Sequence, residues 1–190
     1  MGRQKEFTPD EALDKAMHVF WAKGYYDTSI RDLIEGTGVN YYGLYSEFEN
    51  KHGLYLAALD RYRETVTAKV LKSLRAATPD EKGLAGAMSF AVRAMTPSKS
   101  CKGCLIGNSI IEVSGADPDA KARTDAHRRV LEEAFQTFLR SGPWAEDEDT
   151  VAVKARYLAT AFYTMGMLIR SGASKSDIQD HINLTLTALR

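Results

Sequence analysis

Two stretches of this sequence read Thr, Pro, Asp, Glu in succession, at residues 8–11 and 78–81. A threonine cap, a proline in the first turn and a glutamate at the third helical position together form a capping box with a fixed first turn. Each stretch therefore predicts a helix start. Asn50, Asp117 before a proline, and Ser174 predict further starts. Because no segment alternates apolar and polar residues as a strand does, we predict an all-α fold.

Apolar residues at helical spacing between these starts predict about nine helices, with ends placed to within ~2–4 residues. Their ranges are 8–23, 29–36, 40–47, 50–77, 79–96, 102–115, 118–141, 148–171 and 174–189. The long helix from residue 50 separates short helices from longer ones. We therefore predict a head over residues 1–50, a connecting helix over 51–77 and a second domain over 78–190.

The charges of the chain are balanced, with 25 Lys and Arg residues against 25 Asp and Glu residues. Any DNA-binding surface must therefore be local. The longest nearly apolar stretch, residues 157–169, is shorter than the ~20 residues that span a bilayer, and residues 1–6 lack the apolar core of a signal peptide. We expect a cytoplasmic protein with no membrane partner.

Motifs that carry enzyme chemistry are absent from the sequence. It contains no G-x-S-x-G, no phosphate-binding P-loop and no H-E-x-x-H, and Gly36 and Gly38 lack the third glycine of a dinucleotide-binding motif. We therefore expect neither an enzyme nor a cofactor or metal ion.

The predicted head contains two short helices joined by a glycine-containing turn. Ile30 and Leu33 lie on the apolar side of the first helix, residues 36–38 (Gly-Thr-Gly) form the turn, and Leu44 and Phe48 lie on the apolar side of the second. This is the plan of a helix-turn-helix, whose second helix enters the DNA major groove, about 12 Å wide.

The second helix of this motif begins with Tyr41, Tyr42 and Gly43. The tyrosines lie off its apolar side, so core packing does not account for them. Hydroxyl contacts with phosphates or bases, and ring contacts with thymine methyl groups, would account for them. The alternative is that both tyrosines extend the core.

A set of residues in and around the motif has a familiar arrangement: Gly24, Tyr25, Thr28, Ser29, Ile30, Arg31, Asp32, Leu33, Gly38, Val39, Gly43, Leu44, Tyr45, Phe48, Lys51 and Leu54. Over residues 8–60 this arrangement resembles the head of the TetR family of transcriptional repressors almost position for position. The resemblance implies a double-stranded DNA operator as partner. It implies phosphate contacts for Thr28, Arg31 and Lys51, base contacts for Tyr41, Tyr42 and Gly43, a DNA-backbone contact for Tyr45, and a capping role for Asn40.

The head departs from a typical DNA-binding domain in its charge. Through residue 60 it carries six Lys and Arg residues against ten Asp and Glu residues. Glu47 also stands where family members often carry a basic residue or histidine. This electrostatic pattern leads us to expect modest affinity and strong salt sensitivity rather than sticky, histone-like binding.

The resemblance further implies a homodimer formed through the last two helices. Two apolar stripes at helical spacing fit this expectation: Tyr157, Ala161, Met165, Leu168 and Ile169 in one helix, and Ile178, Ile182, Leu186 and Leu189 in the other. Paired with a second copy, these helices would form a four-helix interface. The alternative is a core within one chain.

An effector pocket inside the second domain is also implied by the resemblance. Many of the large adaptable side chains of this half would surround it, and Asn108 or Tyr163 would supply polar contacts to a small, largely apolar molecule. Effector binding would favour a geometry whose two recognition helices no longer match adjacent major grooves.

The cysteines, Cys101 and Cys104, are the one reactive constellation of the second domain. Gly103-Cys104-Leu105 with Asn108 resembles a branch of the family that includes repressors responding to electrophiles and oxidants. A thiol near a helix N-terminus and beside Lys102 would have its thiolate form favoured, so both cysteines are candidate sensors. The alternative is an inert, buried side chain.

Other classes of function remain open at this point. A thiol oxidoreductase would use Cys101 and Cys104, but its motif belongs at a strand-to-helix junction and no strand is predicted. A zinc site would need further ligands, for which His127 and His181 are candidates by sequence distance alone. A helical interaction adaptor is the third alternative, and a shift assay with genomic DNA separates it from a repressor.

Overall fold

The computed structural model describes residues 8–98, 103–145 and 147–190. Every regular element in these residues is a helix: α1 (Pro9–Lys23), α2 (Ile30–Thr37), α3 (Tyr41–Phe48), α4 (Lys51–Tyr62), the π-helical turn η1 (Arg63–Thr67), α5 (Ala68–Ala76), α6 (Glu81–Ala94), α7 (Leu105–Glu112), α8 (Pro118–Arg140), α9 (Glu148–Ser171) and α10 (Lys175–Thr187). Because α4, η1 and α5 follow one another without a break, the described residues form nine helices. The predicted all-α fold is confirmed. None of these helices is both long and apolar enough to cross a membrane.

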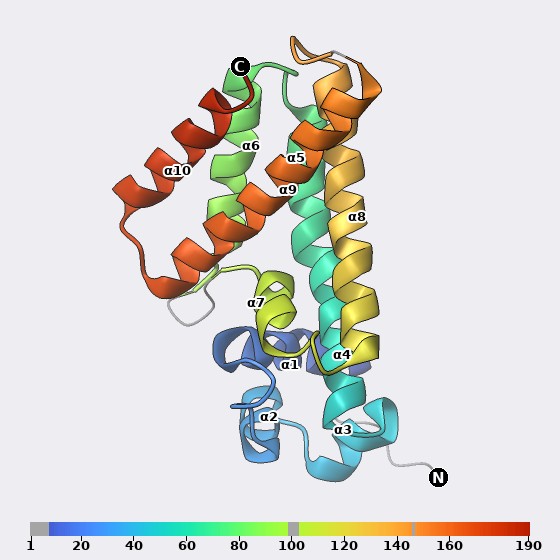
Figure 1. The fold of residues 1–190 in the computed structure, drawn as a ribbon. Coiled ribbons are helices and arrows are strands. Elements are labelled where there is room, and N and C mark those ends of the chain that lie inside the picture. Colours follow the sequence, from blue (N-terminus) through green and yellow to red (C-terminus); the bar gives the residue numbers. More distant parts are fainter. Residues whose placement is uncertain (1–7, 99–102, 146) are drawn as a thin grey trace.

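The helices form a small head and a larger body joined by the long helix α4–η1–α5 (Figure 1). At one end, α1 packs on α2 and α4, and α3 packs on α4. The long helix continues into the body, where α5 packs on α6 and α8. Helix α9 packs along α8 and contacts α10, α6 and α7. The short α7 lies between head and body (Figure 1).

Side-chain caps begin the helices largely where the sequence predicts them. Thr8 Oγ1 accepts from Glu11 N, and Asn50, Asp117 and Ser174 cap α4, α8 and α10 in the same way. The second Thr-Pro-Asp-Glu stretch behaves differently.

Helix α6 begins two residues later than expected from a Thr78 cap. Asp80 is the cap, with its Oδ1 accepting from Gly83 N at 2.7 Å. The turn before it packs tightly, because a Cβ placed on Gly142 would lie 2.3 Å from the Pro79 carbonyl oxygen. Long-range packing thus fixes residues 78 and 79 outside the helix.

Helix α7 is shorter at both ends than the predicted 102–115. It begins at Leu105, with Cys104 as its cap residue, and ends at Glu112. Gly103 has φ +77, and a Cβ there would lie 2.5 Å from the Gly166 carbonyl oxygen of α9. This conformation is outside the helical region and favours glycine, so the helix cannot include residue 103.

The buried side chains of head and body form one continuous apolar cluster. At the junction, Trp21 of α1 meets Tyr62 of α4 edge-to-face, with ring centroids 4.9 Å apart, and Phe20 meets Tyr55 at 5.1 Å. All four rings are almost fully buried. The orientation of the head is therefore coupled to packing in the body, and the division at residue 78 stays a prediction.

The π-helical turn η1 places an extra residue in the hydrogen-bond ladder of the long helix, since Ala68 N donates to Arg63 O. Its last residue, Thr67, is buried and shares a 3.0 Å hydrogen bond with Nε2 of His127 on α8. Turns of this kind are frequent at functional sites. The sequence carried no signal for it.

Candidate DNA-binding interface

The two helices of the motif are each fixed by local capping. Ser29 and Asp32 form a reciprocal capping box at the start of α2, and Gly38 ends α2 in the left-handed region at φ +74. Asn40 Oδ1 accepts from Gly43 N at 2.8 Å and begins α3, as the resemblance implied. The sharp turn between them sets the angle between α2 and α3.

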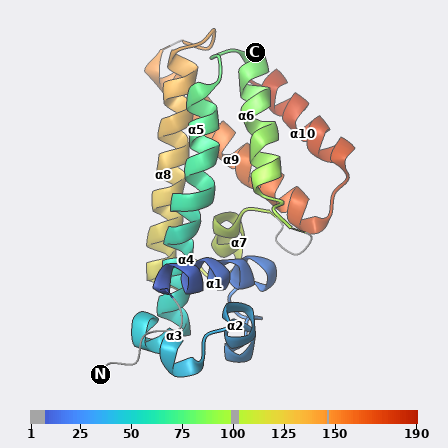
Figure 2. The same cartoon turned by 180° about the vertical axis from the view of Figure 1, so that it is seen from behind.

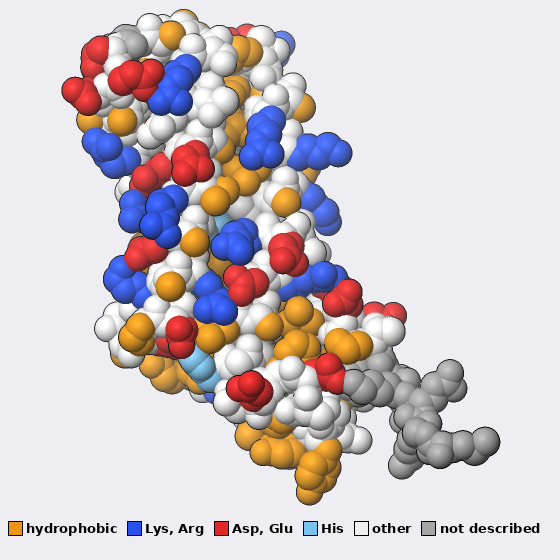
Figure 3. All heavy atoms as spheres, turned by 90° about the vertical axis from the view of Figure 1, so that its right-hand side faces the viewer, with side chains coloured by type: hydrophobic (Ala, Val, Ile, Leu, Met, Phe, Trp, Pro, Cys, Tyr) orange, Lys and Arg blue, Asp and Glu red, His pale blue; other side chains and the backbone are white. Residues whose placement is uncertain are grey.

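Helix α3 presents a tyrosine surface at its N-terminal end. Leu44 is completely buried, whereas Tyr42 is 84% exposed and Tyr41 is 48% exposed. The two rings meet edge-to-face at 5.7 Å. The alternative that both tyrosines extend the core is therefore wrong. Figure 3 shows hydrophobic-class side chains, among which tyrosine is counted, gathered at the tip of the head.

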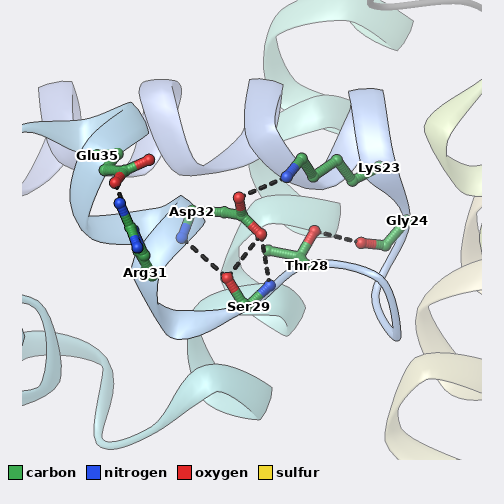
Figure 4. Close-up of polar contacts among 7 residues, drawn as sticks. All are labelled: Lys23, Gly24, Thr28, Ser29, Arg31, Asp32 and Glu35. Atoms are coloured by element: carbon green, nitrogen blue, oxygen red, sulfur yellow. Dashed lines mark hydrogen bonds and ion pairs between the residues drawn. The ribbon is translucent and has the colours of Figure 1, made fainter.

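Arg31 projects from the first turn of α2 with its side chain 85% exposed. Its Nε donates to Glu35 Oε1 at 2.7 Å (Figure 4). Exposed pairs of this kind contribute little stability, so Arg31 can exchange Glu35 for a phosphate.

Asp32 holds the start of α2 in place. It accepts from Lys23 Nζ and from the backbone and hydroxyl of Ser29 (Figure 4). These bonds, that of Lys23 first, hold the pKa of the Asp32 carboxyl well below its usual range. Lys23 is thereby engaged within the protein.

Thr28 does not lie where a phosphate could contact it. Its side chain is completely buried, and its Oγ1 donates to the Gly24 carbonyl oxygen at 2.5 Å (Figure 4). The implied phosphate contact of this side chain is therefore wrong for this structure. Thr28 instead fixes the loop between α1 and α2.

Tyr45 is also turned inward. Its ring lies edge-to-face against Tyr41 at 4.6 Å, and its hydroxyl oxygen is buried without a hydrogen-bond partner among the described residues. Burial raises the pKa of this hydroxyl. The buried Tyr45 hydroxyl cannot contact the DNA backbone in this geometry. The Tyr45 ring instead packs against Tyr41.

Lys51 stands at the first position of α4, next to its cap Asn50. Its Nζ lies 4.5 Å from the centroid of the Tyr25 ring, a cation–π contact. Partial burial lowers the pKa of the ammonium group. The contact holds the cation beside the loop that leads into α2.

The local charge agrees with the sequence. In Figure 3, acidic side chains lie close to the tip, while Lys and Arg side chains gather over the body. The exposed surface at the tip thus combines two tyrosine rings with few cations. Such a surface suits contacts with base edges and groove walls more than a wide electrostatic footprint.

The sequences of known proteins agree with this geometry. The sequence model described as "Bacterial regulatory proteins, tetR family" matches residues 12–58. The chain is 31% identical over its full length to the uncharacterized HTH-type transcriptional regulator YezE of Bacillus subtilis, which it covers completely. It is 32% identical to the HTH-type transcriptional repressor ComR of Escherichia coli, over 97% of this chain and 90% of that protein. The chain belongs to the TetR family.

A solved structure extends the likeness to the whole TetR-family fold. It is a cysteine mutant of the TetR family transcriptional regulator CifR, complexed with 26-base-pair double-strand operator DNA. The TM-score is 0.84 at 25% identity, over 98% of this chain and 99% of that one. The present chain is accordingly a helix-turn-helix, DNA-binding transcription regulator.

Polar contacts between head and body were not foreseen from the sequence. Trp21 Nε1 donates to the Gly103 carbonyl oxygen at 2.8 Å, and Arg170 Nη1 donates to the carbonyl oxygens of Trp21 and Ala22 at 2.9 and 3.1 Å. These contacts tie the C-terminal end of α1 to α9 and to the residue before Cys104.

Two further contacts join the other side of the head to the body. Tyr26 N donates to Glu112 Oε1 of α7 at 2.8 Å, and His52 Nε2 of α4 lies 2.7 Å from Asp117 Oδ2 at the start of α8. A displacement of α7, α8 or α9 in this TetR-family regulator would therefore reach the head directly.

Cys104 occupies a closed site rather than a reactive one. Its side chain is 1% exposed, and Gly107 N donates to its Sγ at 3.4 Å. Burial raises the pKa of the thiol. The expected lowering of this pKa is therefore wrong, since loss of hydration outweighs the helix N-terminus. Cys101 and Lys102 lie outside the described residues.

The polar residues predicted to contact an effector, Asn108 and Tyr163, do not line the apolar pocket of the body. A narrow apolar pocket between α5, α6, α8 and α9 is lined by residues that include Leu74, Met88, Phe135 and Phe162. It has about 10 Å³ of free space, close to the size of one water molecule. Neither Asn108 nor Tyr163 is among its lining residues, and Asn108 lies half-buried on α7.

Tyr163 instead belongs to a buried polar chain. Its hydroxyl shares a 2.7 Å hydrogen bond with His127 Nδ1, while His127 Nε2 is bonded to Thr67. Burial, with a smaller contribution from Arg63, lowers the pKa of His127 to about 4. Burial also raises the pKa of Tyr163 far above its usual value.

The histidines considered for zinc have other partners. Both ring nitrogens of His127 are hydrogen-bonded, and His181 Nε2 lies 2.8 Å from the Ala161 carbonyl oxygen. Among the described residues, His52, Asp117 and Asp119 place one potential ligand atom each within 4.8 Å of one another. Both oxygens of Asp117 already have hydrogen-bond partners, because Asp117 caps α8 and contacts His52.

Proposed function

We propose that this chain is a repressor that binds a pseudo-palindromic operator as a homodimer, through α3 of each copy, and is released by an effector. The observation that carries the proposal is the pair of exposed tyrosines, Tyr41 and Tyr42, on the capped first turn of α3. Aromatic rings and hydroxyl groups at this end of a recognition helix can reach base edges in the major groove. The CifR mutant, whose fold is similar to that of this chain, is complexed with operator DNA.

Most residues of the two predicted apolar stripes, such as Met165, Ile182 and Leu189, are buried within the single chain, as the alternative of an intrachain core expected. Other apolar residues of α9 and α10 are exposed and support the proposed dimer. Val153, Tyr157 and Met167 of α9 and Leu184 of α10 have large exposed side chains. The two helices also pack on each other, so these residues belong to neighbouring elements (Figure 1). An isologous contact between two copies would bury the same patch on both subunits.

Selection of genomic fragments followed by footprinting tests this function. We expect two protected half-sites related by two-fold symmetry, about one helical turn or somewhat more apart. Sedimentation of the free protein should give a dimer. Protection of one asymmetric site by a monomer contradicts the proposal, and failure to retain any fragment favours the adaptor alternative.

Lys51 should contribute affinity without specificity. We expect Lys51→Met, which keeps the aliphatic stem over Tyr25, to weaken binding to every DNA sequence by a similar factor. The slope of log K against log salt should fall by about one phosphate per subunit, or about two per dimer. Titrations at several salt concentrations measure this.

Lys72, an exposed lysine of α5 and not part of the helix-turn-helix, provides the matched control. Lys72→Met should leave both affinity and salt slope unchanged. A selective loss at the operator in the Lys51 variant would instead assign Lys51 to sequence readout.

We also propose that release begins at the N-terminus of α7, through a small apolar or electrophilic effector. The support is the position of Cys104 beside Gly103, whose carbonyl oxygen accepts from Trp21 of the head. A molecule bound to, or joined to, Cys104 would displace this segment and shift the population toward a geometry that does not fit the operator.

The burial of Cys104 gives this proposal a kinetic signature. We expect a maleimide to modify Cys104 slowly near neutral pH, because the thiol must first become exposed and lose its proton. Modification should then release operator DNA. Cys104→Ser should bind DNA like the unmodified protein, since serine is a good helix cap, and should resist release.

Mass spectrometry of the labelled protein distinguishes Cys104 from Cys101. If the maleimide releases the Cys104→Ser protein from operator DNA as readily as it releases the original protein, Cys104 is a packing residue. The effector then binds without covalent chemistry. The apolar pocket between α5, α6, α8 and α9 is then the site to examine.

A further inference from the structure

A second groove lies at the junction of head and body, apart from the narrow apolar pocket. It has a free volume of about 460 Å³. Met17, His18 and Trp21 of α1 form one wall, Val66 and Lys69 of η1 and α5 form another, and Pro97 after α6 closes one end. Seen from behind, α1 crosses the long helix below the end of α6 (Figure 2). The volume lies within the roughly 300–1,000 Å³ range of small-molecule sites, which often form at domain junctions.

The walls of this groove combine flat, apolar surface with one available cation. The rings of His18 and Trp21 are stacked with an interplanar angle of 16° and centroids 5.8 Å apart. Trp21 and Met17 are buried beneath this wall, and Val66 and Pro97 supply its accessible apolar part. Such a surface accepts a planar or slender apolar group.

The charges in the groove select the sign of the ligand. Asp14 lines the groove, but its two oxygens accept from Nε and Nη2 of Arg61 at 2.6 and 2.9 Å. This bidentate pair compensates the carboxylate. Lys69 lines the same groove and, among the described residues, has no ion-pair partner within 4.0 Å. The remaining charge is therefore positive.

We propose that this groove binds a small aromatic carboxylate, with its ring against the exposed His18 ring, which is stacked on the buried Trp21, and its carboxylate on Lys69. This ligand makes a charge-assisted hydrogen bond with the ammonium group and places its apolar part on His18 and Val66. A neutral ligand of the same shape gains only the apolar contact. A cationic ligand of the same shape is repelled by the ammonium group of Lys69.

The position of the groove gives such a ligand an effect on the head. Its α1 wall belongs to the head, and its other walls belong to the long helix and the end of α6. The α1 wall contains Trp21, which also bonds to Gly103. A ligand that contacts both parts stabilises one orientation of the head relative to the body, so it biases operator binding.

Intrinsic fluorescence provides the test, because the chain has only two tryptophans, Trp21 and Trp144. In a Trp144→Phe protein, emission excited at 295 nm comes from Trp21, which is stacked directly beneath His18 of the groove wall. Three probes of one shape are titrated without DNA: 4-phenylbutyrate, 4-phenyl-1-butanol and 4-phenylbutylamine. We expect the carboxylate to change Trp21 emission with an affinity on the order of tenfold above that of the alcohol, and the amine to bind most weakly.

Lys69→Met should remove the preference for the carboxylate and leave the affinity for the alcohol unchanged. Because Lys69 is exposed, the substitution should not disturb folding. Lys72→Met on the same helix is the matched control. Equal binding of carboxylate and alcohol, stronger binding of the amine, an unchanged preference in Lys69→Met, or no response of Trp21 overturns the proposal. Because no DNA is present, these outcomes are independent of whether the chain is a repressor.

Discussion

Replacing Tyr42 with alanine should reduce operator affinity by about 1–3 kcal/mol per half-site, or roughly 2–6 kcal/mol for a dimer that uses both copies. The reason is the exposure of this ring at the first turn of α3, where it has no structural task. Base contacts specify a site and phosphate contacts position the protein. Non-specific DNA binding should therefore stay nearly unchanged. Competition titrations with operator and unrelated DNA at one salt concentration measure the difference.

Tyr42→Phe separates the hydroxyl from the ring. If the hydroxyl donates to a base or phosphate, the phenylalanine protein loses most of the affinity that alanine loses; if the ring contacts a thymine methyl group, it keeps most of it. Thermal unfolding should not change in either variant, because the side chain is 84% exposed. An equal loss of affinity at all sequences removes Tyr42 from the set of residues that read bases.

The fold could be predicted from local chemistry to an unusual degree. Helix starts depend on caps that lie next to the helix in sequence, as for Thr8, Asn50 and Ser174. The two misplaced starts, at residues 79 and 102, depend on contacts that no local pattern carries. Pro79 packs on Gly142, and Gly103 packs on Gly166. Close backbone approaches between distant segments decided both.

The DNA-binding site was predictable to the extent that it depends on helix periodicity. Tyr41 and Tyr42 lie off the apolar side of α3 in the sequence and are exposed in the structure. Thr28 and Tyr45 were assigned by resemblance, and their burial depends on the loop after α1 and on the packing of α3. The predicted lowering of the Cys104 pKa was wrong for a related reason, because the effect of burial on this pKa outweighs that of the helix N-terminus.

The contacts that connect head and body could not be predicted at all. Arg170 and Trp21 are 149 residues apart in sequence, and Trp21 and Gly103 are 82 apart. Neither pair has a pattern that marks it. Yet these bonds attach α1 to the segments where an effector or a thiol modification would act. The contacts on which the proposed release depends thus lie in the part of the structure that sequence patterns describe least.

The stability of the protein should fall between pH 7 and pH 5 because of His127. This side chain is completely buried between Thr67 and Tyr163, and burial lowers its pKa from an ordinary 6.5 to about 4. Below pH 6.5 the unfolded chain takes up a proton that the folded protein does not bind. The stabilisation is therefore complete above pH 6.5 and is lost as the pH falls toward 4. One such group accounts for roughly 2 kcal/mol between pH 7 and pH 5.

Denaturant unfolding at pH 7, 6 and 5 measures this loss, and the NMR signal of the His127 ring gives its pKa in the folded protein directly. The carboxyl groups with lowered pKa, such as Asp32 and Asp14, titrate at lower pH and do not obscure the effect in this range. His127→Gln should be less stable at pH 7 but nearly independent of pH between 7 and 5, because the buried titrating group is gone. If the ring of His127 instead titrates near 6.5 in the folded protein, the chain Thr67–His127–Tyr163 is open to water, and α4–η1, α8 and α9 are not held together there as the structure has them.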